Sequence, residues 1–402
     1  MRIAHLTTVD SSLRYLLLPQ LMEITARGGT AIGISAPGPD VPFLEVSGIE
    51  HWALTASTRS ASVASDMKAA WQLWRLLRRD PVDVLHTHNP KPGVYGRIVG
   101  RLARVPLVVN TVHGFYATES DSFLKRGAVY LIEGLAGLFS DAELVQSKED
   151  VVVMRRFKIG RSSRTTHLGN GIDLNRFQPQ LRGSGRDRIR VELGIAPDAV
   201  VVGCVGRLVA EKGIPELIEA WDLRQTEFEL LVVGPSDPTK SDALEPEMID
   251  AAERSGVRFL GHRGDVQYLY QALDLFVLPS HREGFPRAAM EAAASGVAIV
   301  ATNIRGCREV VDNGVNGLLV PKKDPAALAA AIDQLVRDPS ARKAMGEQGR
   351  VKAQAEFDER TVVERVMATY RDVAKRKGRM DLYQALTASV SGTAGRGDSR
   401  DG

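Results

Sequence analysis

Residues 273–296, LDLFVLPSHREGFPRAAMEAAASG, contain a pattern that recurs through most of this chain. The apolar run at its start ends at Ser280, as a buried strand would. A short loop follows, and Pro286 then begins an alanine-rich helical stretch at the position where a helix best tolerates proline. A strand, a loop and a helix in this order are typical of the parallel sheets of α/β proteins.

The same alternation occupies both halves of the chain. We expect strands at 3–9, 30–36, 82–88, 107–113 and 143–147, and then at 199–206, 228–234, 257–261, 273–280, 296–302 and 317–321. Helical patterns lie between them, for example at 66–79, 121–138, 214–223 and 324–337. The sequence therefore predicts two doubly wound, Rossmann-like parallel-sheet domains of the α/β class, facing each other across a cleft, with ligands at the carboxyl ends of the strands.

The turn-rich passage from 167 to 187 marks the boundary between these domains. We place the first domain at 1–180 and the second at 181–357. The pattern at 358–376 predicts one more amphipathic helix. Residues 377–402 lack periodicity and are expected to form a disordered tail.

Composition excludes several classes of protein. The chain has 402 residues, of which 44% are apolar and 25% charged, and its net charge is +3, which does not suggest dedicated nucleic-acid binding. Its two cysteines, Cys204 and Cys307, fit neither a disulfide framework nor a four-cysteine zinc site, and they favour a reducing, cytoplasmic location.

The start of the chain does not resemble a signal peptide. The apolar run at 127–139 is shorter than the roughly 20 residues of a membrane span.

The loop after the strand at 273–280 is the first candidate site. Glycine at 284 and the beginning of a helix at Pro286 would offer free backbone N–H groups to a phosphate. Glu283 and Glu291 are carboxylates that could accept hydrogen bonds from sugar hydroxyls. From spacing alone, a solvated loop charge and an ordinary helix-surface glutamate are the simpler interpretation of these two residues.

The second candidate is GCVGRLVAEKG at 203–213. The expected strand ends at Gly206, and Arg207 and Lys212 follow it, a guanidinium and an ammonium that suit a diphosphate. Two surface bases near a turn are the alternative. The spacing is not GxGxxG, which argues against a dinucleotide cofactor.

Histidines at the ends of two expected strands form the third candidate. His113 ends the strand at 107–113, and His86 and His88 share one face of the strand at 82–88. A metal site would need a third ligand, which the spacing does not name, so buried or strand-end histidines without a metal are the simpler interpretation. The chain contains no Asp-x-Asp pair, so we expect no metal at the site and no cofactor, and a bound diphosphate would be balanced by Arg207, Lys212 and helix dipoles.

Taken together, these candidates resemble the retaining glycosyltransferases of the GT-B fold, family 4 type. The resemblance rests on Gly206-Arg207-x4-Lys212-Gly213, on Glu283-x7-Glu291, on the NGID…F.P passage at 170–179 and on His113. The resemblance spans roughly residues 1–375. It is strongest to enzymes that build bacterial surface polysaccharides or lipid-linked oligosaccharides, which commonly use UDP-sugars, often N-acetylhexosamines. It implies a nucleotide-sugar donor, a saccharide or polyprenyl-linked acceptor, and retention of anomeric configuration without a metal ion.

The resemblance also implies roles for individual residues. Arg207 and Lys212 would hold the donor diphosphate and stabilise the departing phosphate, and His113 would approach the transferred sugar and the acceptor. Glu283 would bond sugar hydroxyls, Glu291 the ribose, and the loop at His262 and Arg263 would border the base. The remaining donor-site residues would be Gly206, Gly284, Phe285, Pro286 and Arg287. The helix at 358–376 would cross back onto the first domain.

One segment departs from the family pattern. Many relatives have a glycine pair in the loop after the first strand, whereas this chain has Ser11 and Ser12 in residues 7–15. Their hydroxyls could bond a phosphate or a sugar, so both serines are acceptor-binding candidates together with His113.

Two segments could contact an anionic membrane from the cytoplasmic side. Residues 66–80 carry Trp71 and Trp74 beside several arginines, although a helix packed on the first sheet explains them more simply. Residues 122–139 are the better candidate, because they follow His113 and a polyprenyl-linked acceptor would lie in the bilayer.

Two alternatives belong to other functional classes. A UDP-N-acetylglucosamine 2-epimerase could share the architecture, but it would need acid and base groups in a different layout. A non-catalytic sugar-nucleotide binding protein would not need Arg207, Lys212, Glu283 and Glu291 together.

Overall fold

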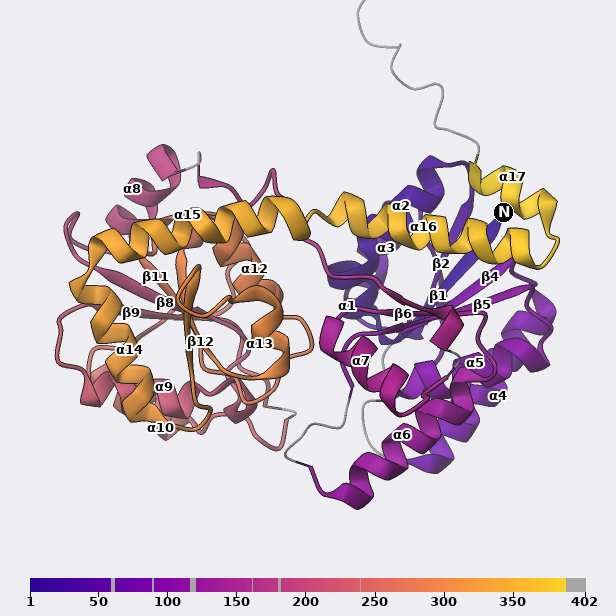
Figure 1. The fold of residues 1–402 in the computed structure, drawn as a ribbon, viewed down its shortest axis with the longest axis horizontal. Helices are drawn as coiled ribbons and strands as arrows, with labels where there is room; N and C mark the ends of the chain where they lie inside the picture. Colours follow the sequence, from indigo (N-terminus) through magenta and orange to yellow (C-terminus); the bar gives the residue numbers. More distant parts are fainter. Residues whose placement is uncertain are drawn as a thin grey trace, which may run out of the picture. The chain divides into compact units, whose positions relative to one another are not determined.

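The computed structural model describes residues 1–58, 62–88, 90–115, 121–160, 162–179, 182–238 and 240–387, without the side chains of residues 162 and 182–184. Its contacts divide the chain into two compact units (Figure 1). Unit 1 contains Met1–Leu168 and the chain from Val362 onward, and unit 2 contains Gly169–Thr361. Each unit is built around its own parallel sheet.

Unit 1 has a seven-stranded sheet over its described residues, in the order β3-β2-β1-β4-β5-β6-β7. Every pair of neighbours is parallel, so the carboxyl ends of all the strands lie at one edge. The strands are β1 (Arg2–Val9), β2 (Thr30–Ala36), β3 (Glu50–Ala53), β4 (Val84–His88), β5 (Leu107–Val112), β6 (Ala142–Val145) and β7 (Thr165–His167).

Helices pack on both faces of this sheet because the central strands are apolar on both sides. Ile3 and Val84 face one helix layer, formed by α2 (Leu18–Ala26), α16 (Glu359–Arg376) and α17 (Met380–Thr387), whereas Ala4 and Leu85 face α4 (Val63–Arg79) and α5 (Pro90–Leu102). The other helices of the unit are α1 (Asp10–Ser12), a π-helical turn (Leu13–Leu17), α3 (Val41–Val46), α6 (Phe123–Gly137), α7 (Lys148–Arg156) and a 3₁₀ turn (Ser162–Arg164).

Unit 2 has a six-stranded parallel sheet over its described residues, in the order β10-β9-β8-β11-β12-β13. The chain reverses its direction of travel across the sheet between β8 and β11, the kind of switch point at which doubly wound sheets bind ligands. The strands are β8 (Val201–Val205), β9 (Glu229–Val233), β10 (Arg258–Phe259), β11 (Leu275–Leu278), β12 (Ala298–Thr302) and β13 (Gly317–Val320).

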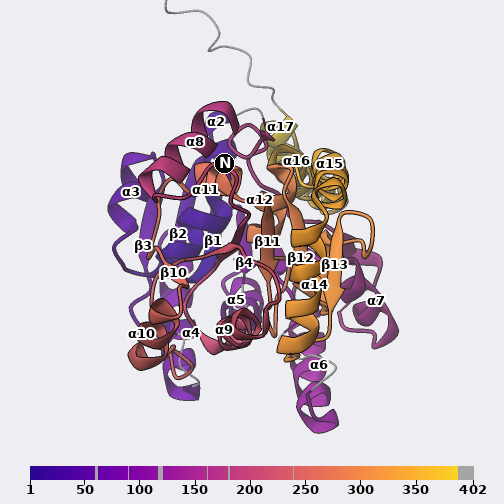
Figure 2. The same ribbon diagram turned by 90° about the vertical axis from the view of Figure 1, so that its left-hand side faces the viewer.

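Helices cover both faces of this second sheet (Figure 2), and an apolar layer lies between the sheet and each set of helices. One contains Val202 and Val277 with α9 (Ile214–Leu223) and α14 (Pro325–Arg337), and the other contains Phe276 with α12 (Arg287–Ala294) and α15 (Pro339–Glu356). The remaining helices are α8 (Arg182–Glu192), a 3₁₀ turn (Ala210–Lys212), α10 (Pro246–Arg254), α11 (Val266–Ala272) and α13 (Arg305–Val310).

The structure has the expected two α/β halves, but the boundary between them differs from the one that the sequence suggested. Unit 2 begins at Gly169 rather than at 181, because residues 169–179 already belong to its fold. The backbone N–H of Ile172 donates to Phe357 at 2.9 Å, and Ile172 and Phe177 are buried in the core of unit 2. The turn residues at 167–187 therefore predicted the region in which the chain passes from unit 1 to unit 2, but not the residue at which unit 2 begins.

The end of the described chain is also more ordered than expected. The prediction of a disordered tail from 377 onward is wrong for Met380–Thr387, which form α17. Leu382 and Leu386 are buried against unit 1, which stabilises a helix too short to persist alone. Residues 388–402 lie outside the described residues. Among the described helices, none combines the length and the apolar character needed to span a bilayer.

Candidate functional site

Adjacent strands of unit 2 bring together the two segments that carry the donor-site candidates. Gly206 follows β8 and Ser280 follows β11, and these strands pair directly. The hydroxyl of Thr302, which ends β12, donates to the carbonyl of Ser280 at 2.5 Å. The carboxyl ends of three neighbouring strands therefore form one contiguous edge.

Lys212 and Glu283 meet at this edge. The ammonium Nζ of Lys212 lies 2.5 Å from Oε1 of Glu283, and Ser280 donates its hydroxyl to the same oxygen at 2.8 Å. Both charged side chains are mostly buried, so their attraction is weakly screened. The arrangement holds a cation where the loops after β8 and β11 come together.

Glycines make that approach possible. Gly213 has a φ of +70°, and a Cβ on it would collide with the carbonyl of Pro279. Gly306, at the beginning of α13, leaves no room for a Cβ either, because the backbone oxygens of Glu283 and Gly284 face it. These two contacts fix the loop at 280–286 from both sides.

Arg207 directly follows Gly206 in the chain. Its Nη1 is 2.9 Å from Oδ2 of Asp237, and its side chain is about half exposed (43%). The segment is positioned by backbone hydrogen bonds between Gly206 and Val233 and between Leu208 and Pro235. Arg207 and Lys212 both follow β8, so the half-exposed guanidinium adds a second cation to the segment that carries Lys212.

Glu291 lies on α12, where Tyr270 donates its hydroxyl to Oε2 of the carboxylate at 3.0 Å. Burial raises the pKa of Glu291, and the Arg287 charge opposes that shift. Arg287 donates to the carbonyl of Gly171 at 3.1 Å, and the carbonyl of Phe285 accepts from the amide of Asn170 at 3.3 Å. The NGID passage thus packs against the donor loop.

Arg263 has a different environment from the other donor-site candidates. It follows β10 and forms paired hydrogen bonds with Asp265 and ion pairs with Glu192 on α8. The hydrogen bonds that Arg263 donates to Asp265 and Glu192 raise the pKa of Arg263. Its guanidinium is occupied by these carboxylates, and the structure does not bring it into the cluster of Lys212 and Glu283.

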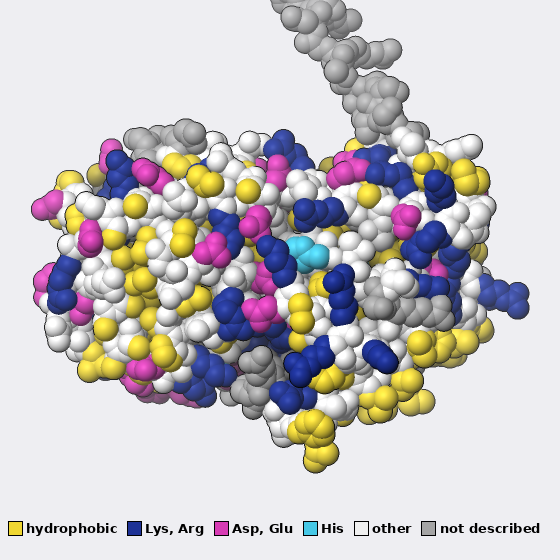
Figure 3. All heavy atoms as spheres, viewed as in Figure 1, with side chains coloured by type: hydrophobic (Ala, Val, Ile, Leu, Met, Phe, Trp, Pro, Cys, Tyr) yellow, Lys and Arg dark blue, Asp and Glu magenta, His cyan; other side chains and the backbone are white. Residues whose placement is uncertain are grey.

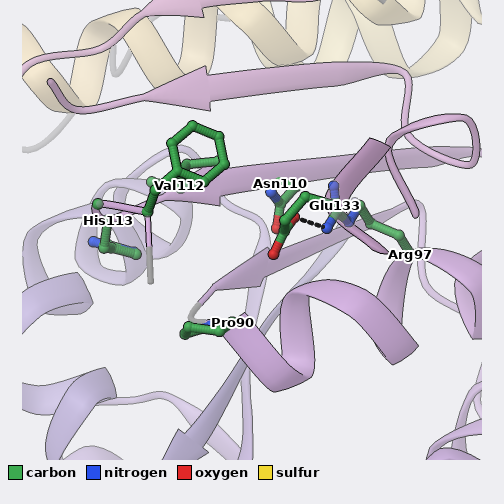
Figure 4. Close-up of a pocket in the computed structure, with 9 residues that line it drawn as sticks. Pro90, Arg97, Asn110, Val112, His113 and Glu133 are labelled. Atoms are coloured by element: carbon green, nitrogen blue, oxygen red, sulfur yellow. Dashed lines mark hydrogen bonds and ion pairs between the residues drawn. The ribbon is translucent and has the colours of Figure 1, made fainter. Parts of the chain in front are cut away.

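His113 follows β5 at the carboxyl edge of the unit 1 sheet. It lines a cavity of about 30 Å³, the volume of one water molecule, together with the buried polar residues Arg97 and Asn110 and the partly buried Glu133 (Figure 4). Arg97 bridges Glu133 at 2.5 Å and Glu143 at 2.9 Å. Burial lowers the pKa of His113 to about 4, so the imidazole is neutral at pH 7.

Sequence reasoning missed two partners of the strand-end histidines. His5 on β1 pairs in register with His86 on β4, and its Nδ1 lies 3.0 Å from Nε2 of His88. Tyr370 on α16 approaches His86, with its hydroxyl 2.6 Å from Nδ1. Histidines at positions 5, 86 and 88 of two expected buried strands could have indicated a shared cluster. Only the register between the two strands shows that the three side chains lie on one face of the sheet.

The segment with Ser11 and Ser12 is not a loop. β1 runs to Val9, which is extended and directly precedes α1, so the chain passes from strand to helix without an intervening loop. The carboxylate of Asp10 accepts from the backbone N–H groups of Ser11 and Asp40. Both serines are partly exposed at the carboxyl end of β1 and remain acceptor-site predictions.

The segment at 122–139 forms α6 and exposes large apolar side chains, with Phe123 80% and Leu124 83% exposed. Leu131, Leu135 and Leu138 continue this α6 face. Hydrophobic side chains (yellow) and basic side chains (dark blue) lie close together over this part of unit 1 (Figure 3). A cavity of about 400 Å³ between α6 and Phe157 opens beside it. On α4, Leu73 and Leu77 are buried in the core as expected, while Trp71 and Trp74 are about half exposed.

Comparison with known proteins identifies the chain. The family model for group 1 glycosyl transferases matches residues 185–352, and that for the glycosyl transferase 4-like domain matches residues 23–171. The capsular polysaccharide biosynthesis glycosyltransferase CapM of Staphylococcus aureus is 27% identical over 93% of this chain and 98% of its own. The UDP-Gal:alpha-D-GlcNAc-diphosphoundecaprenol alpha-1,3-galactosyltransferase of Escherichia coli is 31% identical over 75% of this chain and 77% of its own.

A solved structure has the same fold. The crystal structure of Anabaena HepE in complex with UDP and glucose superposes with a TM-score of 0.75 at 22% identity, covering 92% of this chain and 99% of that one. Both halves of the chain therefore match in sequence, and the whole matches in architecture. The chain belongs to the group 1 glycosyl transferases and is a GT-B glycosyltransferase of the family 4 type.

Proposed function

We propose that this glycosyltransferase transfers a sugar from a UDP-sugar, such as an N-acetylhexosamine donor, to a hydroxyl of a saccharide or a polyprenyl-linked saccharide. The observation that carries the proposal is the meeting of Lys212 and Glu283 at the ends of β8 and β11. One residue offers a cation to a diphosphate, and the other offers an acceptor to sugar hydroxyls. Arg207, two strand-end glycines and the carboxylate of Glu291 complete the donor half.

The chemistry of the proposed step follows from charge. The bond between the anomeric carbon and the diphosphate oxygen breaks, and negative charge builds on the departing diphosphate. Arg207 and Lys212 would stabilise that charge, as preorganised donors do in other active sites. The acceptor hydroxyl forms the new bond on the same face, so configuration is retained, and its proton passes to the leaving phosphate oxygen. No metal ion is assigned to this step, because the two side-chain cations and the helix dipole would supply the positive charge.

The comparisons support the donor and the acceptor class. The E. coli relative is named for a UDP-sugar donor and a diphosphoundecaprenol-linked acceptor, and the Anabaena structure is titled as a complex with UDP and glucose. CapM is named for capsular polysaccharide biosynthesis. A role in cell-surface polysaccharide or lipid-linked saccharide synthesis is the function that agrees with all three.

A donor screen tests the proposal. Thermal shifts would be measured with UDP-, GDP- and ADP-sugars, each as hexose and N-acetylhexosamine, in the presence of a chelator. Stabilisation follows RT ln(1 + [L]/Kd), so we expect the UDP series to raise the melting temperature most. No shift with any UDP-sugar would contradict the donor assignment.

An incubation with the bound donor and no acceptor separates the transferase from an epimerase. We expect slow hydrolysis or no change, followed by transfer when an acceptor saccharide is added. NMR of the product should show the donor's anomeric configuration. An epimerised nucleotide sugar would favour the isomerase, and nucleotide binding without turnover of any acceptor would favour a binding protein.

We further propose that the α6 face contacts an anionic membrane surface on the cytoplasmic side. Its apolar side chains stand beside Arg126 and Lys158, which suits anionic headgroups. In a flotation assay with anionic vesicles, Phe123→Ser with Leu124→Ser should abolish co-flotation. Trp71→Ser, an exposed aromatic on α4, is the matched control and should leave it unchanged; loss of binding in the control alone would assign the contact to α4 instead.

A further inference from the structure

A pocket of about 510 Å³ lies in unit 2 at the edge of the sheet opposite the donor-site candidates. Asp274 directly precedes β11 and Gly296 precedes β12, so the pocket lies at the amino ends of these strands. Ser280, by contrast, follows the carboxyl end of β11. The other lining residues come from the chain before α8 and from the first two thirds of α15: Pro179, Pro339, Arg342, Lys343, Glu347 and Arg350.

The close packing of α15 on the end of α12 shapes this pocket (Figure 1). Two glycines of α15 permit the approach. A Cβ on Gly346 would collide with the carbonyl of Gly296, and a Cβ on Gly349 would contact Ala293 of α12. The walls of the pocket are therefore set by helix packing, and the side chains that α15 contributes have a fixed backbone beneath them.

Both arginines of the pocket are held by backbone carbonyls. Nη1 of Arg350 donates to the carbonyls of Phe177 and Ala294, each at 2.9 Å. Nη1 of Arg342 donates to two carbonyls in the last turn of α14. Nε and Nη2 of both guanidiniums have no hydrogen-bond partner among the described residues. Because a carbonyl is neutral, these bonds orient the two guanidiniums without balancing their charge, and each keeps free N–H donors.

The pocket has an excess of positive charge. Of its two carboxylates, Asp274 already pairs with two arginines of α8, at 2.9 and 2.7 Å, and Glu347 is the other. Within the part of the chain that the structure describes, Arg342, Lys343 and Arg350 form no ion pair with a carboxylate. Burial lowers the pKa of Arg350, and no neighbouring charge opposes that shift. Three cations therefore line one pocket without a counter-ion of their own.

We propose that this pocket binds the phosphate group of a small soluble compound, with Arg342, Lys343 and Arg350 as the cations that hold it. Guanidiniums present paired N–H donors to phosphate oxygens, and an ammonium adds a point charge. The volume lies in the range of small-ligand sites. Apart from two prolines, the lining residues are charged or glycine, which favours a polar ligand over a hydrocarbon chain. The site goes beyond the proposed transfer, because it shares no residue with the donor-site candidates.

The test is a titration of the full-length protein with inorganic pyrophosphate at constant ionic strength, followed through the Nε–H NMR signals of Arg342 and Arg350. We expect both signals to shift and to saturate together. Lys343→Glu reverses an exposed charge, so the melting temperature should stay close to that of the wild type. The affinity should fall about tenfold or more, the usual effect of losing a hydrogen bond to a charged group. Lys343→Gln, which only removes the charge, should give a smaller loss.

Arg254→Glu is the matched control, because it makes the same change in net charge at an exposed position on α10 outside the pocket. It should keep the wild-type affinity. Lys212→Ala, at the donor edge, should also leave the shifts of Arg342 and Arg350 unchanged, so failure of the donor assignment would not be mistaken for failure of this site. In flotation with anionic vesicles, Lys343→Glu should behave as the wild type does.

Four results would overturn the proposal. The first is the absence of shifts at millimolar pyrophosphate, and the second is equal affinity of the wild type and Lys343→Glu. Equal losses in Lys343→Glu and Arg254→Glu would mean that pyrophosphate responds only to the overall charge of the protein. Loss of flotation in Lys343→Glu would assign the pocket to lipid headgroups instead of a soluble compound.

Discussion

The ammonium of Lys212 lies 2.5 Å from a carboxylate oxygen of Glu283, although 71 residues separate the two along the chain. The contact exists because β8 and β11 are neighbours in a parallel sheet and both side chains follow strand ends. It joins the group that would balance a diphosphate to the group that would bind the sugar. Neither side chain can be moved without disturbing the other.

Replacing Lys212 by alanine should therefore reduce catalysis more than it reduces substrate binding. The charge on the leaving diphosphate is greatest in the transition state, so we expect kcat to fall about 10²–10³-fold. Initial rates at saturating donor measure this. Lys352→Ala, which removes a lysine from an ion pair with Asp312 in the same unit, should keep wild-type kcat. Similar losses in both variants would mean that the effect comes from general destabilisation.

A second prediction concerns Glu291 and the ribose of the donor. If the carboxylate accepts from ribose hydroxyls, Glu291→Gln should weaken UDP binding about tenfold to a hundredfold, the usual range for a hydrogen bond to a charged group. Wild-type protein should lose a similar factor with 2′,3′-dideoxy-UDP. The variant should then bind both nucleotides alike, as coupled groups do in a double-mutant cycle. Independent, additive losses measured by titration calorimetry would contradict the assignment.

The close approach of Gly213 to Pro279 gives a stability prediction. Gly213→Ala introduces a Cβ into occupied space at a left-handed backbone position, and we expect a loss of about 3 kcal/mol, from strain and overpacking together. Gly194 has a similar φ of +63° with nothing within reach of a Cβ, so Gly194→Ala isolates the strain. Thermal unfolding should show the larger drop in melting temperature for Gly213→Ala. Equal drops would mean that the loops do not depend on this contact.

The buried histidines predict how the stability of unit 1 depends on pH. Their folded pKa values lie below the unfolded value of about 6.5, so between pH 6.5 and 4 the unfolded chain binds protons that the folded chain does not. The free energy of unfolding should fall as the pH falls through this window, by up to ~1.4 kcal/mol per pH unit for each histidine. Hydrogen exchange of unit 1 amides at pH 7 and pH 5 measures it. His5→Gln should give a shallower dependence, and an unchanged slope would argue against a neutral, buried His5.

The sequence predicted the parts of the fold that depend on local pattern. The apolar runs before Gly206 and Ser280 end where β8 and β11 end within a few residues, because buried parallel strands need continuous apolar stretches. The short strands β3 and β7 were missed, since Glu50–Ala53 and Thr165–His167 carry polar residues at exposed positions. α17 was missed because its two buried leucines stabilise a helix only by packing against the rest of unit 1, which the local pattern does not show.

The candidate site also combines features that the sequence predicts with features that depend on tertiary packing. Proximity of Lys212 to Glu283 follows from strand order, which alternation and family resemblance together make predictable. The partners of Arg263 and of His86 do not follow, because Glu192 and Tyr370 come from distant helices whose placement is set by packing. Long-range register and helix docking are tertiary properties that no short motif in this chain encodes.

The central claim is that side-chain cations, rather than a metal ion, balance the donor diphosphate. Titration calorimetry of UDP into full-length protein dialysed against a chelator tests it most directly. The account predicts binding that is unchanged when manganese replaces the chelator, and that weakens by about tenfold or more when Arg207→Ala and Lys212→Ala are combined. Binding that disappears in the chelator and returns with manganese, or a double variant that binds UDP as tightly as the wild type, would contradict it.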